Sequence, residues 1–354
     1  MARLSMVRCF LPLMVVVGLA VSAPAADTEL EAATGRFTSF FKQGDYEAAT
    51  KAAQEALKIA LDHHGEDAPE TAGCLQNLAT VLLELGVLED AEKLLALALS
   101  INEKKLGENA VATASTLNAL GLVCSRLDKP KEAERYFNRA LAVQEKVLGP
   151  DHPVTGITVD NLAVLYGFQR RFREAEPVHR RAVAILEKAV DREVDAATAI
   201  NNFAHLCTRL GRNDEALDLY RRALAILEKS LGPDHPATAL CLGNLGGVLA
   251  EQRKFPEAET MLTRSLAVRE KIYGANHDYT ANALYNLGSL YADMGRYDAA
   301  RPLLERAVEI CSHVYGPDDR RTQLIRTALA DVHRHTGGAP GVRPESRASP
   351  GGGR

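Results

Sequence analysis

The chain has 354 residues, of which 46% are apolar, 25% charged and 5% aromatic, and its formal net charge is −4. So much apolar sequence can bury a large core, although a single compact core rarely grows to this size. The absence of tryptophan, the few aromatic residues and the lack of a basic excess argue against a nucleic-acid-binding protein.

The N-terminus has the pattern of a secretory signal peptide. Arg3 and Arg8 precede an apolar run from Cys9 to Val21, and the small residues Ala23-Pro24-Ala25 follow it. The run is short for a membrane span, so we expect residues 1–25 to be removed during export to the periplasm or out of the cell. The alternative is a protein anchored in the membrane by residues 9–21. After cleavage we expect no stable membrane insertion.

The rest of the chain repeats about every 42 residues. A glycine preceded by leucine or tyrosine recurs at Gly107, Gly149, Gly232, Gly274 and Gly316. Three spacings are equal (149 − 107 = 42, 274 − 232 = 42, 316 − 274 = 42), and the remaining one, 232 − 149 = 83, is two periods less one residue. A fixed period of this length predicts an array of small units that bury their apolar faces only against their neighbours.

Each unit has the pattern of two helices. Apolar residues at three- and four-residue spacing, such as Leu75, Leu78 and Leu82, predict the first helix. A turn follows, with glycine at Gly44, Gly86, Gly211 and Gly295. Small residues then recur in the second helix, where they allow two helices to approach closely. They form two series: Ala91, Ala133, Ala175, Ala216, Ala258 and Ala300, and seven residues later Ala98, Ala140, Ala182, Ala223, Ser265 and Ala307.

The period predicts seven hairpins. Their expected spans are 28–62, 68–104, 110–146, 152–188, 194–229, 236–271 and 278–313. The fifth follows a linker without glycine, Ala189 to Val194, where the one-residue deletion lies. A last helix from Asp319 to His335 is expected to cap the array, because Arg320, Arg321 and Arg326 make it polar. Residues 336–354 are rich in glycine, proline, serine and arginine and are expected to form a disordered tail after the repeat domain of residues 26–335.

At these positions the sequence resembles the tetratricopeptide repeat. The family pattern is met by Leu162, Ala163, Tyr166, Ala175, His179 and Ala182, and again by Leu287, Gly288, Tyr291, Ala300, Leu304 and Ala307. The longer period and the link Leu148-Gly-Pro-Asp-His-Pro153, repeated from Leu231 to Pro236, look like the kinesin-light-chain subfamily. The resemblance covers about residues 36–335. It implies a right-handed α-solenoid whose first helices line a concave, peptide-binding groove.

The sequence departs from the family in two ways. Aliphatic residues (Leu75, Leu117 and Ile200) stand where the family usually has an aromatic residue at the start of the first helix. The heptad coiled coil of kinesin light chains is absent, so the resemblance extends to the fold and the binding mode but not to a motor partnership.

The sequence offers no catalytic or metal-binding constellation. His152, His235 and His277 recur in the links, 83 and 42 residues apart. Neighbouring units stand too far apart for them to share a metal ion, so we assign them a role in the turns. His179 takes a core position. Cysteines at equivalent positions of different repeats cannot pair, and we interpret them as small buried residues. We therefore predict a non-enzymatic protein without cofactor or metal.

A row of asparagines on the first helices is the candidate binding surface. The residue before the core leucine, or before Phe203 in the fifth hairpin, is an asparagine at Asn77, Asn161, Asn202, Asn244 and Asn286, and Asn118 and Asn201 lie one place earlier. An amide offers both a donor and an acceptor, and the resemblance implies that such rows bind peptide backbone. The alternative is that these asparagines brace neighbouring helices. Both roles remain open at this stage.

A second row, near the ends of the first helices, gives the expected groove a charge pattern. It contains Glu84, Arg126, Phe168, Arg209, Glu251 and Asp293. If these residues face the groove, its centre is basic and aromatic and its ends are acidic. That pattern favours a peptide with an acidic centre and an apolar residue near Phe168. The alternative for each arginine is an ordinary solvated charge.

These observations predict an exported scaffold that binds protein or peptide segments, with affinity spread over several repeats. The alternative function is a structural protein that self-associates in the cell envelope or extracellular matrix. The sequence does not identify the partner.

Overall fold

The computed structural model describes residues 25–336, and within that range it contains 15 helices and no strand. The expected signal peptide and C-terminal tail lie outside the described residues, apart from their last and first positions, and both stay predictions. No helix of the described range is both long and apolar enough to cross a membrane. The described residues divide into two compact units, 25–252 and 253–336, and the predicted sixth hairpin is divided between them.

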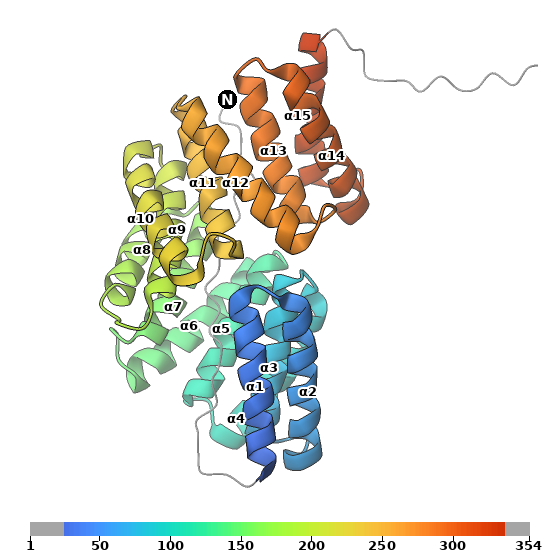
Figure 1. The fold of residues 1–354 in the computed structure, drawn as a ribbon. Coiled ribbons are helices and arrows are strands. Elements are labelled where there is room, and N and C mark those ends of the chain that lie inside the picture. The colour runs from blue at the N-terminus through green and yellow to red at the C-terminus, as the bar shows by residue number, and fades with distance from the viewer. Residues whose placement is uncertain (1–24, 337–354) are drawn as a thin grey trace, which may run out of the picture. The chain divides into compact units, whose positions relative to one another are not determined.

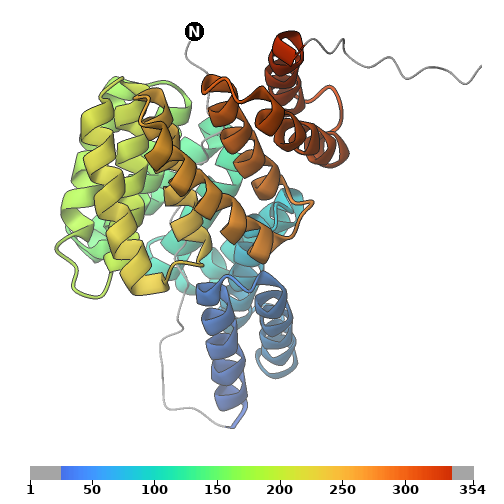
Figure 2. The ribbon, with the colours of Figure 1, turned by 45° about the horizontal axis from the view of Figure 1, so that its top comes forward.

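In the first unit each helix packs on the helix before it, as Figures 1 and 2 show from two directions. Its helices are α1 (Ala25–Gln43), α2 (Tyr46–His64), α3 (Pro69–Glu84), α4 (Leu88–Leu106), α5 (Val111–Arg126), α6 (Pro130–Val147), α7 (Pro153–Phe168), α8 (Phe172–Leu186), α9 (Glu193–Arg209), α10 (Asn213–Leu231) and α11 (Pro236–Glu251). The odd-numbered first helices from α1 to α11 also contact one another, so they form an inner layer, with the second helices packed against them.

The second unit continues the same alternation. It contains α12 (Phe255–Tyr273), α13 (Asp278–Asp293), α14 (Tyr297–Tyr315) and α15 (Arg320–Thr336). The last helix buries Thr322, Ile325 and Val332 and leaves most of its remaining side chains exposed or partly exposed. This confirms the predicted polar capping helix. The observed hairpins begin and end within a few residues of the predicted spans, which shows an all-α solenoid.

The links between hairpins share one local structure. Each glycine that follows a second helix has a positive φ, between 82° and 101° at Gly65, Gly107, Gly149, Gly232, Gly274 and Gly316. Its carbonyl accepts a hydrogen bond from a buried threonine hydroxyl six residues later, at 2.7–2.9 Å, at Thr71, Thr113, Thr155, Thr238, Thr280 and Thr322. The linker before α9 lacks this glycine and its threonine; there α8 ends early, at Leu186, and Val190 is 83% exposed.

Small residues set the distance between helices. The first alanine series of the second helices, Ala49, Ala91, Ala133, Ala175, Ala216, Ala258 and Ala300, is fully buried. Some first helices have glycine where they face a large side chain. A Cβ atom on Gly121 would lie 2.5 Å from the Phe137 ring, and one on Gly288 would lie 2.9 Å from Leu304. A large side chain on one helix of these hairpins is therefore matched by a glycine on the other helix.

Ion pairs join successive second helices at their edges. Glu134, Glu176 and Glu259, which the sequence marks as acidic residues at helix starts, each accept a bond from an arginine one repeat later. The arginines Arg171 and Arg296 also stack on Tyr166 and Tyr291, at 4.1 and 4.3 Å from the ring centres. A second series, nearer the helix ends, pairs Glu103 with Arg139, Glu145 with Arg181, Glu187 with Arg222, and Glu270 with Arg306. These pairs are partly exposed, so each contributes little by itself.

The cysteines of the described residues are free and buried, which confirms that they are small core residues. Burial raises the pKa of Cys74 to about 12 and, together with nearby carboxylates, the pKa of Cys124 and Cys207 to about 11. Burial also raises the pKa of Cys241. A thiol that stays protonated and covered is a poor nucleophile.

We predict opposite effects of two glycine-to-alanine substitutions. Gly121→Ala forces a methyl group against Phe137 and should lower the free energy of unfolding by about 1–3 kcal/mol. The matched control is Gly73→Ala in α3, where a Cβ atom meets nothing within 4 Å; it should raise stability by about 0.5–1 kcal/mol. Urea unfolding measures both, and an increase in both variants would contradict the packing described for Gly121.

We also predict that the five cysteines of residues 26–354 are unreactive in the native protein. A chromogenic disulfide reagent at mildly alkaline pH should react with them only at the rate of unfolding, and should titrate all of them at once in guanidinium chloride. An added exposed cysteine, Arg173→Cys, provides the rapid reference in the same protein. Rapid reaction of several native thiols would disagree with their burial.

Candidate functional site

Two columns of polar side chains run along the inner layer of first helices. In three successive steps an asparagine amide donates to the side chain one place earlier in the preceding repeat. Asn161 donates to Asn118 at 3.0 Å, Asn202 to Asp160 at 2.8 Å, and Asn244 to Asn201 at 3.2 Å. Buried amides of this kind need partners, and here each finds one on the neighbouring first helix. We call these residues the polar ladder.

The polar ladder shows the bracing role that the sequence left open. Its asparagines and Asp160 are at most 5% exposed, and Asn77 is buried as well. Asn286, in the second unit, is partly exposed. The bonds join the units of the array directly. The peptide-binding role expected of these asparagines stays a prediction, and most of their surface is covered in this structure.

The fourth repeat has a charged member in the polar ladder. Asp160 is fully buried, and its second carboxylate oxygen contacts Nδ1 of His179 at 3.0 Å. His179 is itself 2% exposed and lies against the Phe203 ring, with 6.0 Å between ring centres. This confirms that His179 is a core residue with a partner. In the preceding repeat the equivalent residues are Asn118 and Phe137, so this pair is specific to one hairpin.

The residues of the second row have different partners and different exposure in the structure. Arg126 donates to the Leu83 carbonyl at 2.7 Å and pairs with Glu84 at 3.4 Å, so its charge is largely used within the fold. Glu251 is exposed and accepts a hydrogen bond from Asn213 at 3.3 Å, while partial desolvation of its carboxyl raises its pKa. Phe168, by contrast, is 52% exposed, and Arg209 is exposed beside it.

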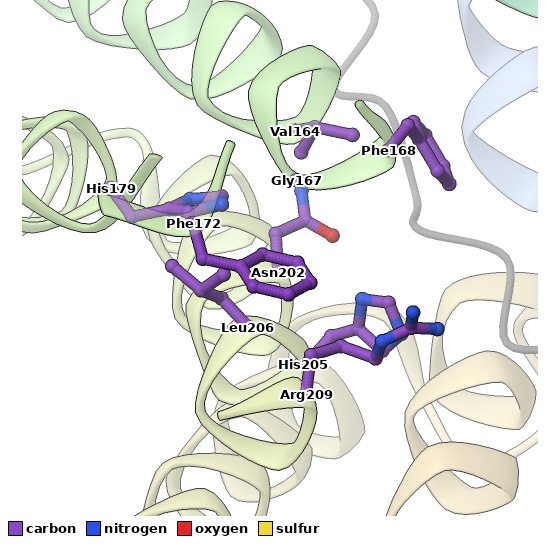
Figure 3. Close-up of a pocket in the computed structure, with 9 residues that line it drawn as sticks. All are labelled: Val164, Gly167, Phe168, Phe172, His179, Asn202, His205, Leu206 and Arg209. Carbon is purple, nitrogen blue, oxygen red and sulfur yellow. The ribbon is translucent and has the colours of Figure 1, made fainter. Parts of the chain in front are cut away.

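Phe168 and Arg209 border a pocket between the ends of α7, α8 and α9. Its cavity volume is about 80 Å³, and it is lined by Val164, Gly167, Phe168, Phe172, His179, Asn202, His205, Leu206 and Arg209. Figure 3 shows Phe168, His205 and Arg209 on one side and His179, Phe172 and Leu206 on the other, with Asn202 between them. A cavity of this size accommodates a side chain rather than a whole cofactor.

The pocket combines an apolar wall with nitrogen-bearing groups. The Arg209 guanidinium lies 6.0 Å from the centre of the Phe172 ring, a cation–π contact that also places its charge at the opening. Burial, with smaller effects of the charges of Arg209 and His179, lowers the pKa of His205 to about 4. His205 is therefore neutral at physiological pH. The arrangement suits an incoming group that is both apolar and negatively charged.

The sequence pattern did not identify His205 as a candidate residue. It precedes Arg209 by four residues, so both lie on one face of α9, and that spacing is the signal that could have revealed it. The link histidines do what was predicted. Nδ1 of His152, His235 and His277 accepts the amide N–H two residues later, at 3.1–3.2 Å, and so caps the next first helix. Within residues 25–336 no cluster of three or more His, Cys, Asp or Glu side chains could hold a metal ion.

The repeat pattern matches a family model over nearly the whole described chain. The tetratricopeptide repeat model matches residues 38–104, 73–146, 112–188, 195–271, 243–310 and 279–339. The chain belongs to the tetratricopeptide repeat family. TPR proteins generally mediate protein–protein interactions, so the family assignment gives the class of activity without a partner.

Several solved structures resemble this TPR protein. The Signal Transduction ATPase with Numerous Domains from Pyrococcus horikoshii, which carries a tetratricopeptide repeat sensor, aligns with a TM-score of 0.60 at 14% identity, over 89% of this chain and 45% of that one. At this identity the likeness concerns the fold alone. The kinesin light chain repeats of Podosopora anserina give a TM-score of 0.47 at 22% identity, over 58% of this chain and 98% of theirs. Pseudomonas aeruginosa pilF gives 0.45 at 17%, over 72% and 96%. No curated protein matches.

We predict that Asp160 and His179 are energetically coupled. His179→Phe leaves a buried carboxylate held by Asn202 alone and should lower the free energy of unfolding by about 3–5 kcal/mol. Adding Asp160→Asn removes that buried charge and gives the neutral residue found at Asn118 and Asn201, so it should recover the part of the loss that comes from the unpaired carboxylate. Thermal or urea unfolding of the single and double variants measures the coupling; a double variant no more stable than His179→Phe would refute it.

Proposed function

We propose that this TPR protein is a non-catalytic scaffold that binds extended peptide segments along its inner layer of first helices. The pocket beside Phe168 and Arg209 is the observation that carries the proposal. Phe168 is 52% exposed, whereas every other phenylalanine and tyrosine of residues 28–336 is buried or partly buried. Exposed apolar residues beside a cavity are typical of contact sites.

Arg209 supports the same site. Within residues 25–336 no carboxylate lies within ion-pair distance of its guanidinium, whereas Arg126, in the equivalent position of an earlier repeat, pairs with Glu84. An unpaired guanidinium at the edge of an apolar pocket favours a carboxylate from outside. We therefore propose a ligand segment with an acidic residue at Arg209 and an apolar side chain against Phe168 and Phe172.

The polar ladder supports this function indirectly. Because it joins consecutive first helices by side-chain bonds, it fixes the spacing at which they present Phe168 and Arg209. A site held by such bonds loses little conformational freedom when a ligand binds. We also propose, on the residue pattern of the N-terminus alone, that the protein works in the periplasm or outside the cell after export.

We predict that charge reversal at Arg209 weakens peptide binding. The mature chain, immobilised, is used to select from a displayed library of random extended peptides, and the selected peptides are titrated with soluble protein. Acidic peptides with an apolar residue should be enriched, and Arg209→Glu should weaken them about tenfold or more, because hydrogen bonds to charged groups are worth about 1.5–3 kcal/mol. Phe168→Ala should weaken the same peptides.

The matched control is Arg173→Glu, an equal charge change at an exposed position of α8 that does not line the pocket. It should leave affinity within about twofold of the original, because its exposed side chain does not line the pocket and cannot bond a ligand held there. Equal losses in Arg173→Glu and Arg209→Glu would reduce the effect to net charge. Failure to enrich any peptide, or undiminished binding to Arg209→Glu, would overturn the proposed site.

A further inference from the structure

The turn between α1 and α2 contacts the start of α11, across 193 positions of sequence. Nε2 of His235 lies 2.9 Å from the Lys42 carbonyl oxygen. Nδ1 of the same ring accepts the N–H of Ala237, so in the neutral ring Nε2 carries the proton and donates to Lys42. The capping histidine thus uses its second nitrogen to hold a distant turn.

Gly44 shows that this contact is close-packed. A Cβ atom on Gly44 would lie 2.8 Å from both Cγ and Cδ of Pro236. The turn glycines at the equivalent positions of other hairpins, Gly86, Gly211 and Gly295, have the same backbone conformation, with φ between 74° and 79°. They are exposed and a Cβ atom there would meet nothing within 4 Å, whereas Gly44 is buried. The turn between α1 and α2 therefore differs from the other turns because Pro236 packs against it.

The charge of Lys42 also has a small effect on α9. Burial raises the pKa of Asp195, near the start of that helix, and the positive charges of Arg192 and Lys42 act in the opposite direction. Arg192 pairs with Asp195 at 3.2 Å. Lys42 thus bonds α11 through its carbonyl, while its charge has only a small effect on Asp195 at the start of α9.

We propose that the segment Phe41–Asp45, here called the latch, closes α1–α11 into a ring whose inner surface opens when the latch is released. The latch is one neutral hydrogen bond and one glycine–proline contact. Successive helices are joined instead by continuous columns of buried side chains. The latch is therefore the weakest joint of the closed unit. Closure stands independently of peptide binding; its effect on access to the inner surface rests on the proposed function.

Pulsed EPR distances test the closure directly. Spin labels are attached at Lys51→Cys on α2 and Lys229→Cys on α10, both exposed positions, while the buried native thiols stay unlabelled. The protein with an intact latch should give one narrow distribution. Gly44→Ala, which places a methyl group against Pro236, and His235→Gln should each give longer and broader distances.

Each latch variant has a control with the same local defect. Gly86→Ala imposes equal strain at a positive φ without a clash, and His152→Gln alters an equivalent helix cap whose ring makes no contact with a distant turn. Both controls should keep the narrow distribution. Distances in Gly44→Ala and His235→Gln that coincide with those of their controls would overturn the latch.

Peptide kinetics then test the consequence of closure. A peptide selected on the immobilised protein should associate severalfold faster with Gly44→Ala than with Gly86→Ala, because the open form is already populated. Equal association rates in two variants of different EPR distance would show a latch that does not control access. If no peptide is selected, the proposed function fails while the EPR distances still decide whether the ring closes.

Discussion

The close approach of helices at columns of small side chains is the constraint on which this structure depends. Alanines such as Ala133 and Ala175 are fully buried where two helices meet, and glycine replaces alanine where a ring such as that of Phe137 occupies the space. A short interhelical distance leaves little room for side-chain variety inside each hairpin. Each hairpin is therefore closely similar to the next, and differences between hairpins are confined to a few positions.

The positions that differ between hairpins include the residues of the candidate site. The fourth and fifth repeats replace a neutral ladder member with Asp160, a core aromatic with His179, and a solvated or paired residue with the exposed Phe168 and Arg209. The first two changes are internal and hold the hairpin in place, while the exposed Phe168 and Arg209 border an open pocket. Because the polar ladder joins first helices directly, a ligand at the pocket contacts elements that are already fixed relative to one another.

Glycine and histidine each serve two purposes in the first unit. The turn of every hairpin contains a residue in the left-handed conformation. Some hairpins have glycine there, and the others have Asp128, Arg170 or Arg253, at some cost in backbone energy. Gly44 is the member of this series that additionally has no space for a side chain. In the same way, three link histidines cap a helix, and His235 also bonds the latch. The array thus gains a long-range contact without a new motif.

The sequence by itself determined the periodic part of this protein. The spacing of glycines, small residues and apolar residues predicted the helices, the turns, the capping helix and the family, because these depend on contacts within one hairpin or between neighbours. It also predicted a role in the turns for His152 and its equivalents, and the burial of the cysteines. Only the tertiary structure decided which polar residues are covered and which distant segments meet. Asn161 and Arg209 look alike as polar residues on first helices, yet one is bonded within the polar ladder and the other opens to a pocket with His205. The contact between Lys42 and His235 left no periodic signal, because small rotations accumulated over many repeats determine where the chain returns to itself.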